Sequence, residues 1–420
     1  MSDRDPRNPE PADAETSDPF DELDRAYGAG TVRDPYAVFA DMRRECPVHS
    51  ERPHERMGLE MLPVPEGAPP AFSVLSHDAV SEVLRDGERF SSKVYELSVG
   101  VVMGHTILEM DEPEHGRYRG LLQKAFTRRA LERWRNELVV PVVNEHVDRF
   151  AGRGRADLIR ELTFPFPVKV IACMLGLPEG DFQQFHRWAV ELISIGFDWQ
   201  RGLRASASLH DYFSQLLPER KQNPGDDLIS VLAAAELDGA KLSDEEIIAF
   251  LRLLMPAGAE TTYRSSSNLV FGLLTHTDQL EALRADRKLI GPAIEEGLRW
   301  EPPITGIMRQ VTRDTELAGV ALPKGAMLNV TLAAANHDDA RHPDPERFDI
   351  FRVSKQHMAF GYGAHRCLGM YLARMETQVA LEALLDRLPN LRLDPAAEDV
   401  HVTGLIFRCP ASLPVVFDPA

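Results

Sequence analysis

A helical pattern of about thirty residues limits the folds that this chain can adopt. Ser243 followed by Glu246 is a capping-box signature, and apolar residues then recur at helical spacing to about Leu274. At about 1.5 Å per residue such a helix would be roughly 50 Å long and would cross a whole domain. Pro256 cannot donate to the carbonyl of Arg252, so we expect the helix to bend or open there. The alternative is a tolerated kink without a function.

Helical periodicity also dominates the rest of the chain, and strand-like stretches are short. The helical stretches include residues 34–46, 77–86, 127–150, 166–177 and 181–195. The strand-like stretches are residues 71–76, 306–312, 326–336 and 413–417. This pattern predicts a mainly α fold with small β-sheets (α+β) rather than a βαβ array.

Composition narrows the class of protein. A formal net charge of −18 argues against a nucleic-acid binder, and the four cysteines form no C-x-x-C pair that would indicate zinc or disulfides. Residues 1–18 are acidic and proline-rich, which predicts a disordered tail before a single domain over 19–420. No apolar stretch approaches the roughly 18 to 20 residues of a membrane-spanning helix. We therefore expect a cytoplasmic protein without a membrane anchor.

One cysteine occupies an unusual sequence context, in the stretch HMAFGYGAHRCLG. A good helical pattern follows Cys367, so its thiolate would sit at a helix N-terminus, where free N–H groups and the dipole stabilise negative charge. The stretch permits tight turns and the close approach of a flat cofactor through three glycines, Gly361, Gly363 and Gly369. For a lone cysteine the alternative is a buried free thiol in a glycine loop.

The same stretch resembles the haem-binding loop of the cytochrome P450 family, F-G-x-G-x-H-R-C-x-G, with Phe360, His365 and Cys367 in place. In that family the cysteine thiolate is the axial ligand of the haem iron. The resemblance implies the cytochrome P450 fold, with haem between the long central helix and the helix after Cys367. Without a C-x-x-C-H motif, the expected cofactor is non-covalent haem b.

A second motif precedes the cysteine loop in the order of that family. EEGLR places Glu296 and Arg299 three residues apart on one helix, and it is similar to the family's E-x-x-R. Alone, such a pair is usually a solvated surface pair. HPDPERFD supplies Arg347, which resembles the third member of the family's structural Glu-Arg-Arg cluster.

The resemblance also implies a set of haem contacts. DEPEHGRYR carries His115 and Arg119, similar to the family's H-x-x-x-R, and Arg309 takes the place of an arginine that reaches a propionate. With His365 these are four donors for two carboxylates. The alternative for each is an ordinary surface basic residue. The expected cofactor-binding set is His115, Arg119, Arg309, Phe360, Gly361, His365 and Gly369.

The long helix carries AGAETT, which resembles the family's oxygen-activating segment. An axial thiolate favours O–O cleavage, which also needs protons. Thr261 is expected to hold a water, and Glu260 to relay protons from solvent. The alternatives are an i,i+4 surface pair of Glu260 with Arg264 and a Thr261 hydroxyl bonded back to a carbonyl. Pro256 departs from the aliphatic residue usual before this segment, which leaves the shape of the pocket open.

These features imply a haem-thiolate monooxygenase that uses O2 on an apolar small molecule. No G-x-G-x-x-G follows a strand, so electrons are expected from a separate ferredoxin with its NAD(P)H-dependent reductase. A peroxide-driven peroxygenase and a non-catalytic haem sensor are the alternatives, and the Glu260–Thr261 pair argues against both. The basic residues expected to receive ferredoxin are Arg117, Lys124, Arg128, Arg129, Arg352, Lys355 and Arg366.

The substrate is less well defined by sequence. By resemblance the lining positions are Leu253, Ala257, Ile304, Thr305, Ile307, Ile406 and Phe407. None is a lysine or arginine, which favours a neutral terpenoid, steroid or aromatic over a fatty acid. The segments 91–105 and 193–197 are expected to decide specificity. We expect a monomer.

Overall fold

The computed structural model describes residues 32–59, 67–193, 198–353 and 355–419, so the tail predicted over residues 1–18 lies outside the described residues. Helices dominate, which confirms the predicted class. The α-helices are α2 (Tyr36–Glu45), α3 (Pro53–Arg56), α4 (His77–Arg85), α5 (Val99–Met103), α6 (Glu114–Gln123), α7 (Arg128–Trp134), α8 (Val140–Asp148), α9 (Pro165–Met174), α10 (Phe182–Ile193), α11 (Trp199–Gln222), α12 (Leu228–Ala234), α13 (Asp244–Met255), α14 (Thr261–Thr275), α15 (Thr277–Ala285), α16 (Ile290–Trp300), α17 (Leu332–Asn336) and α18 (Met370–Arg387).

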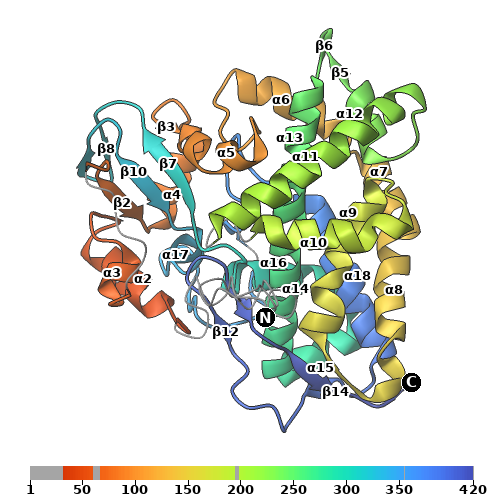
Figure 1. Cartoon of the computed structure of the whole chain (residues 1–420). Coiled ribbons are helices and arrows are strands. Elements are labelled where there is room, and N and C mark those ends of the chain that lie inside the picture. Colours follow the sequence, from red (N-terminus) through yellow and green to blue (C-terminus); the bar gives the residue numbers. More distant parts are fainter. Residues whose placement is uncertain (1–31, 60–66, 194–197, 354, 420) are drawn as a thin grey trace, which may run out of the picture.

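The strands are short, and those of the largest sheet lie to one side of the helices (Figure 1). A five-stranded sheet has the order β1-β2-β10-β7-β3, in which β2 and β10 are parallel and the other pairs antiparallel. A three-stranded sheet has the order β11-β14-β4. The strands are β1 (Val48–His49), β2 (Ala71–Val74), β3 (Phe90–Ser91), β4 (Arg155–Asp157), β5 (Glu236–Leu237), β6 (Ala240–Lys241), β7 (Ile307–Val311), β8 (Thr315–Leu317), β9 (Val320–Leu322), β10 (Met327–Val330), β11 (Arg392–Leu393), β12 (Val402–Thr403), β13 (Cys409–Pro410) and β14 (Pro414–Val416).

The long helix is present, and it opens at the predicted proline. Ser243 caps α13 by accepting from the Glu246 backbone N–H, and the Glu246 carboxylate accepts in return from the Ser243 backbone N–H. The single turn η7 (Pro256–Glu260) is π-helical and joins α13 to α14. Pro256 lacks a backbone N–H and cannot make the regular α-helical hydrogen bond. The wider π-helical turn accommodates this missing donor. α14 packs on both α16 and α18, and the opened turn itself contacts α9 and α10.

One predicted strand is too long. Residues 326–336 were expected to be extended, but the strand ends at Val330 and α17 begins at Leu332. The three alanines of α17 are buried: Ala333 and Ala334 pack in a cluster with residues of α2, and Ala335 packs in a cluster with residues of α4. Across the described ranges, every helix is too short or too polar to span a bilayer.

Candidate active site

The cysteine loop is held in a tight turn by its own backbone. The Cys367 N–H donates to the Phe360 carbonyl at 2.8 Å, and Gly361 has a φ of +66°. At Gly363 a Cβ would lie 2.1 Å from the Leu84 carbonyl oxygen, so only glycine fits where the loop crosses α4. Since α18 begins at Met370, the cysteine precedes its first turn, as predicted.

The Cys367 thiol differs from the other three cysteines in its exposure. Its side chain is exposed, whereas Cys409 is buried and Cys46 and Cys173 are partly buried. Desolvation by the surrounding protein raises the pKa of the Cys367 thiol, and the Gly369 N–H and the guanidinium of Arg119 oppose that rise. A bound cation at the sulfur would oppose that rise and favour the thiolate.

Two predicted histidines meet beside the loop. The rings of His115 and His365 lie 4.0 Å apart between centroids, and Ser92 Oγ is 3.2 Å from His365 Nε2. His115 Nδ1 lies 3.1 Å from Glu112, while its Nε2 is buried without a hydrogen-bond partner among the described residues. Burial, and then the charges of neighbours led by His115, lower the pKa of His365 to about 3. The pair therefore offers polar groups to an anion.

Two predicted arginines complete this donor set. Arg309 is 4% exposed, and the carbonyl of Met308, at 2.8 Å, is the one acceptor that its guanidinium has among the described residues. Arg119 Nη2 donates to the Arg366 carbonyl at 2.6 Å. Burial lowers the pKa of both guanidinium groups. Neither arginine has an ion pair with a carboxylate among the described residues, so the donor set fits the two propionates of a haem.

The oxygen-activating segment shows both of the contacts that the sequence offered as alternatives. Thr261 Oγ1 donates to the Ala257 carbonyl at 2.7 Å, across the opened turn. Arg264 Nη2 lies 3.2 Å from Glu260 Oε1, and both side chains are buried rather than on the surface. Arg264 also stacks over the Phe407 ring. Arg264, one helical turn away, thus holds the Glu260 carboxylate inside the molecule.

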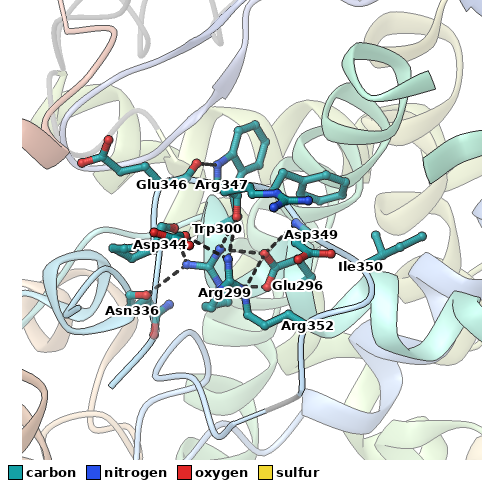
Figure 2. A network of polar contacts seen from close by, with 12 residues as sticks. Glu296, Arg299, Trp300, Asn336, Asp344, Glu346, Arg347, Asp349, Ile350 and Arg352 are labelled. Carbon is teal, nitrogen blue, oxygen red and sulfur yellow. Dashed lines mark hydrogen bonds and ion pairs between the residues drawn. The ribbon is translucent and has the colours of Figure 1, made fainter. Parts of the chain in front are cut away.

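The Glu-Arg-Arg cluster forms, but with a different third arginine. Arg299 binds Glu296 through Nε at 2.8 Å and Nη2 at 2.7 Å, and Figure 2 shows this pair at the centre of the network. Arg352 Nε lies 3.3 Å from Glu296 Oε1. Arg347 is exposed and takes part through its carbonyl oxygen, which accepts from Arg299 and Arg352. The prediction of Arg347 as the third side chain is therefore wrong.

A further ion pair next to the cysteine loop was missed from the sequence. Arg374 on α18 binds Glu295 through two bonds of 2.6 and 2.8 Å, which help to lower the pKa of Glu295 to about 2. The Arg374 guanidinium lies over the Phe360 ring at 4.5 Å. It thus joins α16, α18 and the loop. The sequence offered only a glutamate and an arginine 79 residues apart.

The predicted substrate positions come together in part. Ile304 and Phe407 form an isolated antiparallel bridge, and the Thr305 N–H donates to the Ile406 carbonyl at 2.9 Å. Thr305 Oγ1 donates to the Leu405 carbonyl, so this hydroxyl is engaged in structure. Ile307 begins β7 beside this bridge. On the long helix Leu253 is buried in the helical core and Ala257 is exposed.

The basic residues predicted to receive ferredoxin are not all surface charges. Arg352 belongs to the buried cluster, and Arg117 pairs with Glu246 at 2.5 Å. Arg366 is half-buried, with its Nε unpartnered within the described ranges. The exposed members of the set are Lys124, Arg128, Arg129 and Lys355.

Comparisons with known proteins identify relatives of this chain in sequence and in structure. The family model described as Cytochrome P450 matches residues 181–395. Cytochrome P450 monooxygenase PikC of Streptomyces venezuelae is 37% identical over 382 residues, covering 88% of this chain and 87% of its own. The structure of CYP109Q5 from Chondromyces apiculatus has a TM-score of 0.84 at 34% identity, over 94% of this chain and 98% of that one.

A further structure, CYP109E1 from Bacillus megaterium in complex with testosterone, has a TM-score of 0.82 at 32% identity, over 92% of this chain and 99% of that one. The family model's match, residues 181–395, includes the long helix, the Glu296–Arg299 pair and the cysteine loop, and the relatives include a bacterial monooxygenase. The chain therefore belongs to the cytochrome P450 family and is a haem-thiolate monooxygenase.

Proposed function

We propose that Cys367 is the axial ligand of a non-covalent haem b and that the enzyme inserts one atom of O2 into an apolar small molecule. The observation that carries the proposal is the placement of Cys367 before α18, with the donors His115, Arg119, Arg309 and His365 beside it. When bound, a thiolate-ligated haem supplies O–O cleavage. We further propose that residues 19–420 form one catalytic domain, that the protein is a cytoplasmic monomer, and that a ferredoxin with its reductase delivers electrons.

The function is tested by substrate-dependent NADH consumption with a surrogate ferredoxin and its reductase. We expect product to form only with NADH, both redox proteins and O2. Equal turnover with hydrogen peroxide alone would favour a peroxygenase. A haem protein that never consumes NADH with any ligand would favour a sensor.

In this proposal Thr261 and Glu260 manage protons beside the opened turn. The Thr261 hydroxyl exchanges its bond to the Ala257 carbonyl for one to a water. Glu260 is held by Arg264 and releases to pass protons inward from solvent. The helical wall around the turn is apolar, with Leu254 and Ala259 buried, and it limits the access of other water.

Thr261→Ala is expected to uncouple the reaction. Without the hydroxyl the proton-carrying water is not held, so product per NADH falls several-fold and hydrogen peroxide rises to match. Substrate affinity and NADH consumption stay near wild type. Product, peroxide and NADH are counted in one reaction. A fully coupled Thr261→Ala enzyme would leave the threonine with only its helix contact.

Glu260→Gln is expected to behave differently from the threonine variant. It removes the titrating group while it keeps the shape, so NADH consumption itself slows because proton supply becomes limiting. A larger decrease of NADH consumption in heavy water for the variant than for the wild type would indicate limiting proton transfer rather than a loss of folding. Unchanged consumption would assign Glu260 to its ion pair with Arg264 alone.

The proposed ferredoxin face combines basic and apolar residues. Lys124 and Arg129 are exposed, and Phe351 and Tyr371 are exposed large apolar side chains near the Glu-Arg-Arg cluster and the cysteine loop in sequence. An acidic partner would be steered by the charges and held by the apolar groups.

Lys124→Glu combined with Arg129→Glu should raise the KM for ferredoxin several-fold, and the difference should shrink as salt screens the charges. Arg392→Glu on β11, outside the proposed face, is the control for a charge reversal elsewhere on the surface. Peroxide-supported turnover should not change. Equal effects of the double variant and the control would place docking elsewhere.

A further inference from the structure

Arg252 is a buried cation on the long helix, four residues before the opened turn begins at Pro256. It lies on α13 and is 9% exposed. α5 and α11 both pack against this helix. Its Nη1 donates to the Val102 carbonyl at 3.3 Å and to Ser206 Oγ at 3.1 Å. Both acceptors are neutral, so neither offsets the charge of the guanidinium.

The other edge of the guanidinium is open. Nε is buried without a partner among the described residues, and no acceptor from those residues binds Nη2. The N–H of Nε and one N–H of Nη2 point the same way, and a carboxylate accepts such a parallel pair through its two oxygens. A Cβ at Gly104 would lie 2.9 Å from Nη2, and the φ of Gly104 is +82°. Bare backbone therefore borders this edge.

The charge near Arg252 is incompletely balanced. Burial lowers the pKa of Arg252, and Glu245 is the carboxylate whose charge opposes that effect. Glu245 is largely exposed, lies near His210, and makes no ion pair with Arg252 within the described ranges. Arginine stays protonated in proteins, so burial leaves a desolvated cation that an anion would stabilise.

The position of Arg252 connects it with the proposed oxidation site. It precedes Leu253 on the long helix, and Val102 belongs to the 91–105 segment that the sequence assigned to specificity. Thr261 lies nine residues further, which is about 14 Å along a helix axis. About two and a half helical turns separate the two residues, so an elongated ligand held at Arg252 would have to run both along and around the helix to reach Thr261.

We propose that Arg252 anchors the carboxylate of the substrate, so that the enzyme oxidises an elongated apolar acid. This inference rests on the proposed monooxygenase function and replaces the neutral substrate expected from sequence. That expectation considered only the lining positions taken from the family. Arg252 stands one residue outside them.

The test compares acids with their uncharged methyl esters. The haem-loaded ferric protein is titrated with dodecanoic, hexadecanoic and lithocholic acids and with the ester of each, following the Soret shift and the ligand-induced change in Tm. At least one acid should bind tenfold or more tighter than its ester. Arg252→Gln should remove most of that difference and leave ester binding unchanged, because glutamine keeps a donor for Val102 and Ser206 but has no charge.

Three further variants separate anchoring from packing. Arg252→Lys keeps the charge without the parallel donors and should retain part of the preference. Ser206→Ala removes a neutral hydrogen-bond partner of Arg252 and should retain the whole preference for acids over esters. Arg204→Gln, at an exposed position of α11, removes one positive charge and should change nothing.

Three results would overturn the inference: wild-type protein that binds no acid, acids and esters that bind equally, or an Arg252→Gln variant that weakens both equally. The comparison of acid and ester binding to the wild-type protein tests the inference even if a variant fails to fold. Failure of the proposed function would look different, because the reduced carbon monoxide complex would then lack the thiolate-type absorption band.

Discussion

Cys367→Ser should abolish the thiolate-type absorption band of the reduced carbon monoxide complex, and monooxygenase activity with it. A serine hydroxyl is not ionised at neutral pH, so it cannot replace the electron donation of a thiolate. The loop itself should survive, because its turn depends on the Cys367 N–H bond to Phe360 and on Gly361 rather than on the sulfur. The measurement is the reduced carbon monoxide difference spectrum, with haem content determined separately.

The other three cysteines supply the controls. Cys46→Ser and Cys173→Ser change partly buried thiols and should keep the band. Cys409 is buried and 3.3 Å from Arg264 Nη1, so its serine variant tests whether the buried thiol beside Arg264 matters. A band that persists in Cys367→Ser but vanishes in one of the other variants would move the ligand to that cysteine.

Arg299→Ala should yield little folded haem protein. The variant would leave the Glu296 carboxylate buried beside a single remaining guanidinium, and it would remove the donor to the carbonyls of Asn336, Pro345 and Arg347. Breaking one side of a buried ion pair costs about 3 to 5 kcal/mol, a large share of the stability of a typical domain. Urea unfolding followed by circular dichroism measures the loss.

Alanine variants of Arg352 and Arg347 can be compared directly, because the Arg352 side chain contacts Glu296 and the Arg347 side chain does not. Arg352→Ala should destabilise the protein by more than about 1 kcal/mol, because it removes a charge-assisted contact to Glu296. Arg347→Ala should stay within about 0.5 kcal/mol, because that side chain is exposed. The reverse order would contradict the arrangement in Figure 2.

The sequence predicted Arg347 as the third arginine of the cluster, whereas the structure has Arg352 in that place. Resemblance located the segment, since both residues lie within six positions in the same turn-rich stretch. Which of them faces Glu296 depends on the path of the backbone there, and one bend changes the side on which a side chain emerges. The same limit applied to Glu295 and Arg374, whose contact joins two helices distant in sequence.

Some features were determined by the sequence alone, because their causes are local. The start of the long helix follows from Ser243 and Glu246, its opening follows from the missing donor of Pro256, and the cysteine turn follows from glycines that permit positive φ. Neighbours within a few residues supply every interaction that these features need. The family resemblance rested on the same local motifs.

The tertiary structure alone decided which side chains were buried and with what partners. The sequence allowed a surface pair of Glu260 with Arg264 as an alternative, but both side chains are enclosed, and the polar side chain of Arg252 is buried where α5 and α11 meet α13. Helical spacing records which residues share a face, but not which other helices cover it. Burial sets the free energy of a charge, so the groups that matter most for specificity were the ones that the sequence left undetermined.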